Sequence, residues 1–101
     1  MTNLVQRFDV AMRAMHLMAS LEGRWAASDL GTRIKEHGGL ATAKALLNAE
    51  HASEELLELC RSGRSDLTVE WMIAKNLTWH SLFTKEEVER AWSRVELYSN
   101  P

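Results

Sequence analysis

The sequence contains a single proline, Pro101, which is also its last residue. Proline removes a backbone donor and breaks a helix interior. Because it occurs only once, no other position carries this barrier to helix formation. β-Branched residues are scattered, and apolar and polar residues nowhere alternate with the period of two that marks a half-buried strand. These features predict an all-α fold. Most of the expected breaks between helices are marked by the five glycines: Gly23, Gly31, Gly38, Gly39 and Gly63.

The chain has the length and composition of one globular domain. Its 101 residues match a single domain, and no internal repeat, linker or composition shift divides residues 1–101. Hydrophobic residues make up 46 % and charged residues 26 %, which excludes a disordered tail. We therefore expect a compact single domain of five to six short helices.

Four helices are expected in the first 63 residues, and Gly63 ends the fourth of them. The first is predicted over residues 2–22. Three shorter helices are predicted over residues 28–37, 40–47 and 53–62, with Ser28 as the N-cap of the second. The apolar stripe of the first helix recurs at steps of four and three, as on one helical face; its members are Leu4, Phe8, Ala11, Met15 and Met18.

Two further helices carry clear capping signals. Thr68 is placed to cap a helix over 69–75, and Thr84 with Glu87 forms a capping box for a helix over 84–98. The segment between them, residues 77–82, is predicted to be a tight connector or a single helical turn. The expected core, taken from the inward faces of all six helices, is Leu4, Phe8, Met15, Leu30, Ile34, Leu40, Leu47, Leu56, Leu59, Met72, Ile73, Phe83, Val88, Trp92 and Val95.

Catalytic and metal-binding patterns are weak. Cys60 lies on the inward face of its predicted helix, where a thiol usually packs as a small hydrophobe. His51 with Glu54 or Glu55 offers two metal ligands one turn apart, and two ligands do not make a site. Gly38-Gly39 lacks the further glycines and the Lys-Ser/Thr pair of a phosphate loop. The sequence therefore predicts a protein that is not an enzyme and that holds no metal or cofactor.

Nucleic-acid binding is one alternative. The helices expected over 28–37 and 40–47 join at a glycine turn and could form a helix-turn-helix, with Arg33, Lys35 and Lys44 contacting phosphates. The formal net charge is −2. The helix over 40–47, which would enter the groove of the nucleic acid, nearly lacks the Arg, Asn and Gln that read bases.

Binding to another protein is the preferred interpretation. The chain carries four tryptophans, a heavy aromatic load for a small core, and Trp and Arg are the residues most enriched at binding hot spots. The alternative is that each tryptophan fills the core with its indole N–H bonded to a carbonyl. The expected partner-binding patch comprises Arg61, Arg64, Trp71, Trp79 and His80.

Three segments also carry a resemblance: EHGGLATAKALL over 36–47, RSDLTVE over 64–70 and LFTKEE over 82–87. This order, GGLxxAKxLL … DLTVE … LFTxEE, resembles a group of small uncharacterised bacterial proteins across residues 33–97. The resemblance implies an all-helical fold and a bacterial or phage origin, and it implies no particular activity. The chain departs from the group at Trp71 and Met72, where smaller aliphatic residues are usual, and at Asn76-Leu77, near which a proline is usual.

From these observations we expect a small helical protein that binds and modulates another protein. No apolar run approaches the about eighteen residues that span a bilayer, and no signal-peptide pattern opens the sequence, so we expect a cytoplasmic protein with no membrane contact. The heptad-like stripe of the first helix would also suit a homodimer through that helix.

Overall fold

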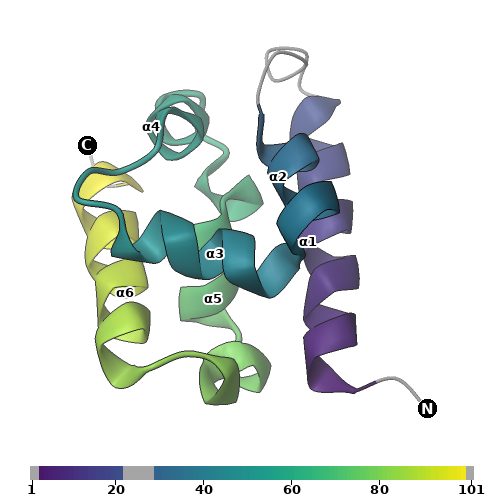
Figure 1. The fold of residues 1–101 in the computed structure, drawn as a ribbon. Coiled ribbons are helices and arrows are strands. Elements are labelled where there is room, and N and C mark those ends of the chain that lie inside the picture. The colour runs from purple at the N-terminus through teal and green to yellow at the C-terminus, as the bar shows by residue number, and fades with distance from the viewer. Residues whose placement is uncertain (1–2, 22–28, 100–101) are drawn as a thin grey trace.

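The computed structural model describes residues 3–21 and 29–99 and confirms the all-α prediction. Six α-helices and two short 3₁₀ helices make up the described chain, which contains no strand (Figure 1). Their bounds, in chain order, are α1 Leu4–Ser20, α2 Leu30–His37, α3 Gly39–Asn48, α4 Glu54–Arg61, η1 Ser65–Leu67, α5 Val69–Lys75, η2 Leu77–Leu82 and α6 Lys85–Ser99. The segment expected to be a connector is η2. The Ser28 cap lies outside the described residues.

Helix α3 crosses the middle of the molecule, with α1 and α2 at one end and α6 at the other (Figure 1). Helix α5 lies behind α3 and packs most extensively against α6. The centre of the core is Phe8 of α1, which is fully buried between Trp79 and Phe83. Both rings meet it edge to face, at centroid distances of 5.2 Å and 5.4 Å, an arrangement that favours the aromatic quadrupoles.

Most of the expected core is buried, and five of its members lie at its margin. Phe8, Ile34, Leu47, Leu56 and Ile73 are almost completely inaccessible to solvent. The positions that are only partly buried are Leu4, Leu40, Met72, Val88 and Trp92.

Local side chains close several helix ends, among them the ends predicted to be capped by Thr68 and Thr84. Asn3 and Gln6 form a reciprocal capping box at the start of α1. Thr68 accepts a hydrogen bond from the backbone N–H of Trp71, and Thr84 accepts one from that of Glu87. Gly63, with φ 76°, ends α4 in a Schellman motif, where its N–H bonds the carbonyl of Cys60.

The start of α3 is closed by a residue of another helix. Gly38 has φ 87° and ψ 159°, a region that only glycine adopts readily, and this lets α3 follow α2 without a longer loop. No side chain next to α3 caps it. Instead, the Asp9 carboxylate of α1 accepts a hydrogen bond of 2.7 Å from the Gly39 N–H, where the helix dipole favours negative charge.

The end of α3 is closed by two arginines of α6. Arg94, buried at 8 % exposure, donates to the carbonyls of Leu46 and Ala49 at 2.7 and 2.6 Å. Arg90 donates to the carbonyl of Leu47 at 3.0 Å. The last carbonyls of a helix lack the regular partners of its interior, and these guanidinium groups donate to them. The Leu46 carbonyl also accepts the backbone N–H of Ala49, at 3.4 Å.

Glu87 joins α3 to the start of α6. Its carboxylate accepts hydrogen bonds from the Lys44 ammonium at 2.7 Å, the Asn48 amide at 2.7 Å and the Thr84 backbone N–H at 2.8 Å. Burial acts to raise the pKa of Glu87, but these three donors outweigh it and lower the pKa to about 2.

Gly39→Ala tests the close contact between α1 and α3. A Cβ at residue 39 would lie 2.9 Å from the backbone Cα of Asp9, which cannot move aside without shifting α1. We expect a loss of about 1–3 kcal/mol in the free energy of unfolding, the usual cost of overpacking. The matched control is Gly31→Ala, whose Cβ would lie 2.6 Å from Nε2 at the far end of the His16 side chain, which can turn aside without moving the backbone. Urea unfolding should leave this control near the wild-type value, and equal losses in both variants would contradict the contact.

Glu87→Gln tests the carboxylate between α3 and α6. Because the pKa of Glu87 is lower in the folded chain than its ordinary 4.5, its contribution to stability is present above pH 4.5 and is lost as pH falls toward 2. A shift of this size corresponds to roughly 3 kcal/mol at neutral pH. Unfolding measured from pH 2 to 7 should show the variant destabilised at pH 7 and matching the wild type near pH 2. Glu86→Gln, at an exposed neighbouring position, should change little at any pH.

Candidate partner-binding site

An open groove runs between the middle of α1 and α5. Its volume is about 290 Å³. The groove, here called the Trp71 groove, is lined by Met15, Asp66, Leu67, Trp71, Met72, Lys75 and Asn76. Methionine side chains adapt their shape to different partners, and tryptophan offers a large contact area, so this lining suits the binding of an apolar side chain.

The Lys75 ammonium holds the tryptophans of this region in place. It lies 4.8 Å from the ring centroid of Trp71 and 4.3 Å from that of Trp92. Both distances are within the range of cation–π attraction. The half-buried Trp71 ring is therefore fixed at the edge of the groove, and fixing it lowers the entropy cost of binding a partner.

Two of the predicted arginines lie on the α4–η1 side of the groove. Arg64 pairs with Asp66, itself a groove residue, with 3.2 Å between Nε and Oδ1. Arg61 is exposed at the end of α4 and pairs with Glu58 at 3.1 Å. Arg64 therefore pairs with Asp66, which lines the same groove as Trp71, and Arg61 lies at the end of α4.

Trp79 occupies a different place from the one expected for a docking residue. Its ring packs on Phe8 in the core and is only 7 % exposed. Its indole N–H has no acceptor within the described chain, so the carbonyl bond expected for a core tryptophan is not formed there. His80 is half-buried, and its Nε2 lies 2.9 Å from the carbonyl oxygen of Ile73. The expected patch is therefore divided, because Trp79 packs in the core whereas Trp71 lines the groove.

The residues expected to contact nucleic acid lie on two helices, and one of them is engaged within the fold. Lys44 is bound to Glu87 and lies 5.1 Å from the centroid of the Phe83 ring, so its charge is already matched inside the fold. Lys35 is exposed and Arg33 is half-buried, both on α2. The exposed residues of α3 are Ala41, Ala45 and Asn48, and the Asn48 amide already donates to the Glu87 carboxylate.

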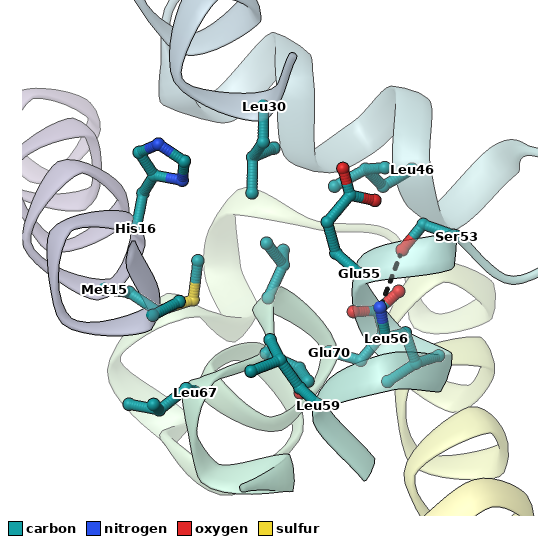
Figure 2. A pocket seen from close by; sticks show the side chains of 13 residues that line it. Met15, His16, Leu30, Leu46, Ser53, Glu55, Leu56, Leu59, Leu67 and Glu70 are labelled. Atoms are coloured by element: carbon teal, nitrogen blue, oxygen red, sulfur yellow. Dashed lines mark hydrogen bonds between the residues drawn. The ribbon is translucent and has the colours of Figure 1, made fainter. Parts of the chain in front are cut away.

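A small enclosed pocket lies between α1, α4 and α5, beneath α2 and α3 (Figure 2). Its volume is about 20 Å³, which is room for about one water molecule. Most of its walls are apolar, and its polar lining residues are His16, Ser53, Glu55, Thr68 and Glu70. The pocket is too small for a metabolite.

Glu70 is the buried carboxyl group of this pocket. It is 1 % exposed, and its Oε2 has no hydrogen-bond donor among the described residues. Burial raises the pKa of Glu70 above its ordinary 4.5; its own backbone N–H and Arg94 oppose this shift, and Glu55 adds to it. A carboxyl group in this setting costs stability when ionised and gives no sign of a bound substrate.

The structure places the other reactive candidates apart. Across residues 3–21 and 29–99, no three His, Cys, Asp or Glu side chains gather as a metal would require, so His51 with Glu54 and Glu55 does not form such a group. Cys60 is half-buried on α4. No helix in this part of the chain combines the length and the apolar character needed to span a bilayer.

One exposed surface, on α1, was not predicted from the sequence. Helix α1 presents large apolar side chains on the side away from the core: Val10, Leu17, Met18 and Leu21. The stripe expected for helix pairing packs inward through Phe8 and Met15, but its last member, Met18, is 52 % exposed and does not belong to the core. A second stripe at steps of four, three and four, which starts at Val10 and passes through Ala14, is visible in the sequence and was the available signal.

Searches with the sequence and the structure return no match among protein-family models, curated proteins or solved structures.

Glu70→Gln tests the buried carboxyl group. Its folded pKa is raised, so the folded chain retains a proton that the unfolded chain releases above pH 4.5, and stability falls as pH rises from 4.5 through the folded pKa. The variant should lack this fall and should be more stable relative to the wild type at pH 8 than at pH 4. Thermal unfolding across this range is the measurement, with the exposed Glu89→Gln as control. A constant difference between variant and wild type at every pH would contradict the assignment.

Proposed function

We propose that the protein is a non-enzymatic interaction protein that binds and modulates another protein through the Trp71 groove. The observation that carries the proposal is the Trp71 ring, held by Lys75 at the edge of an open, mostly apolar groove. Hot spots in protein interfaces are enriched in Trp and Arg and are built around apolar pockets. The described residues offer no comparable arrangement for catalysis, since the enclosed pocket holds about one water.

The chemistry of the groove favours a particular kind of partner segment. Met15, Leu67 and Met72 would receive an apolar side chain. Lys75 belongs to the same lining, and Arg64 is connected to it through its ion pair with the groove residue Asp66. Arg61, on α4, pairs with Glu58. A segment with one apolar anchor and an acidic flank would gain both contacts, because charged rims guide association and apolar centres supply affinity.

The proposal includes a bacterial or phage origin, which the sequence resemblance implies, and a cytoplasmic location, which is expected from the apolar patterning of the sequence. The negative formal charge and the engagement of Lys44 by Glu87 support a protein partner over nucleic acid.

The experiment is co-purification of the tagged full chain from a bacterial lysate, with and without nuclease, followed by mass spectrometry. We expect a stoichiometric protein that survives nuclease. Trp71→Ala should weaken its binding at least about tenfold, as loss of a hot-spot tryptophan does. The double substitution Arg61→Glu with Arg64→Glu should weaken it without touching the core, and so remains informative if Trp71→Ala does not fold.

The matched control is Tyr98→Ala, which removes an exposed aromatic ring of α6 outside the groove. Binding that survives both groove variants would contradict the proposal. Retained material that disappears with nuclease, and whose binding depends on Arg33 and Lys35, would instead identify a nucleic-acid-binding protein.

A further inference from the structure

Helix α4 lies outside the main hydrophobic core. It has eight residues, of which only Leu56 and Leu59 are buried. Among the described residues, it is the one α-helix that contributes no member to the main cluster of core side chains. Leu59 instead belongs to a small separate cluster with Ala19 and Leu67. Because elements with few core contacts open more readily than the whole fold unfolds, α4 is the helix most free to open.

Helix α4 forms one wall of the enclosed pocket that Glu70 of α5 also lines (Figure 2). The Glu70 side chain is 1 % exposed, and its Oε2 has no hydrogen-bond donor within residues 3–21 and 29–99. The Thr68 hydroxyl lines the same pocket, but it already donates to the Ser65 carbonyl at 2.7 Å. In the closed pocket an ionised Glu70 would therefore lose its hydration without gaining donors at Oε2.

The charged and titratable groups around Glu70 come from three helices. His16 of α1 and Glu55 of α4 belong to the pocket lining, whereas the lining residues of α2, α3 and η1 are all leucines. Arg94 of α6 attracts an ionised Glu70, and Glu55 repels it. The Arg94 guanidinium also donates to two carbonyls at the end of α3. Burial is the largest of these influences on Glu70, so the closed pocket favours the protonated carboxyl group.

We propose that α4 is a lid that opens the enclosed pocket when Glu70 loses its proton. In the closed state the protonated carboxyl group lies among the apolar walls. In the open state α4 lies away from the pocket, and water reaches the ionised carboxylate. One proton links the two states, so the ratio of open to closed molecules should rise by up to about tenfold for each pH unit above 4.5, until the folded pKa of Glu70 is reached.

The opening of the lid also affects the Trp71 groove. Met15 and Leu67 line both the enclosed pocket and this groove. Leu67 packs with Leu59 of the lid, so opening α4 removes one of the contacts that hold Leu67 in place. The groove should therefore become less ordered as pH rises. This consequence for partner binding rests on the proposed function, whereas the opening of the lid does not.

Amide hydrogen exchange of the full chain from pH 5 to pH 8 tests the lid, with each rate corrected for the intrinsic pH dependence of exchange. In the wild type, α4 should be less protected than α3 at every pH, and its protection should fall as pH rises. In Glu70→Gln, whose side chain cannot ionise, the protection of α4 should stay constant. The matched control is Glu54→Gln, an exposed carboxyl group on the lid itself, which should keep the pH dependence of the wild type.

Glu70→Leu, which matches the apolar walls, replaces the glutamine variant if that variant does not fold, and it should lose the pH dependence in the same way. Equal protection of α4 and α3 at every pH would show that α4 opens only when the whole chain unfolds, and would overturn the inference. So would a weakly protected α4 whose protection does not change with pH in the wild type. A pH dependence that persists in Glu70→Gln and disappears in His16→Gln would assign the effect to the imidazole and would also overturn it.

Discussion

Helix α3 is closed at both ends by side chains from other helices, and the arrangement of the whole molecule depends on this. Asp9 of α1 accepts from the first turn of α3, and Arg90 and Arg94 of α6 donate to its last carbonyls. A ten-residue helix has little stability of its own in water, so α3 needs these contacts and its packing to form. They join segments 30 to 48 positions apart in the sequence. The central helix therefore cannot form without both ends of the chain.

Two buried glutamates on neighbouring helices show that the groups around a buried carboxyl decide whether its pKa rises or falls. Glu87 meets three donors, and its pKa falls to about 2, so its charge stabilises the junction of α3 and α6. Glu70 lies in an apolar pocket with Oε2 unpaired within the described chain, and burial raises its pKa. Arg94 influences Glu70 while its guanidinium donates to α3, which connects the enclosed pocket to the same structural junction.

Local patterns in the sequence predicted the features that depend on residues close together in the chain, namely the helices and their caps. The Thr84–Glu87 capping box and the six helices follow from spacing and capping chemistry, and the structure confirms them. The roles of Asp9 and Arg94 could not be predicted, because a long-range cap requires knowing which helices meet. Trp79 has the same sequence environment whether it lies in the core or on the surface, and only its packing on Phe8 decides between them. For the candidate site, Trp71 and Arg64 were identified from residue type, whereas the groove that Trp71 and Met15 line together arises from the fold.

The most direct test of this account is amide hydrogen exchange on the wild type and an Arg94→Met variant. Arg94 donates to the carbonyls of Leu46 and Ala49 at the C-terminal end of α3, whereas α1 lies at the opposite end of that helix (Figure 1). If α3 joins the two sides cooperatively, the variant should lose protection across α1, α3 and α6 by the same free energy, of about 2–4 kcal/mol. Loss confined to the last turn of α3 and to α6, with α1 still protected as in the wild type, would contradict the central role of α3.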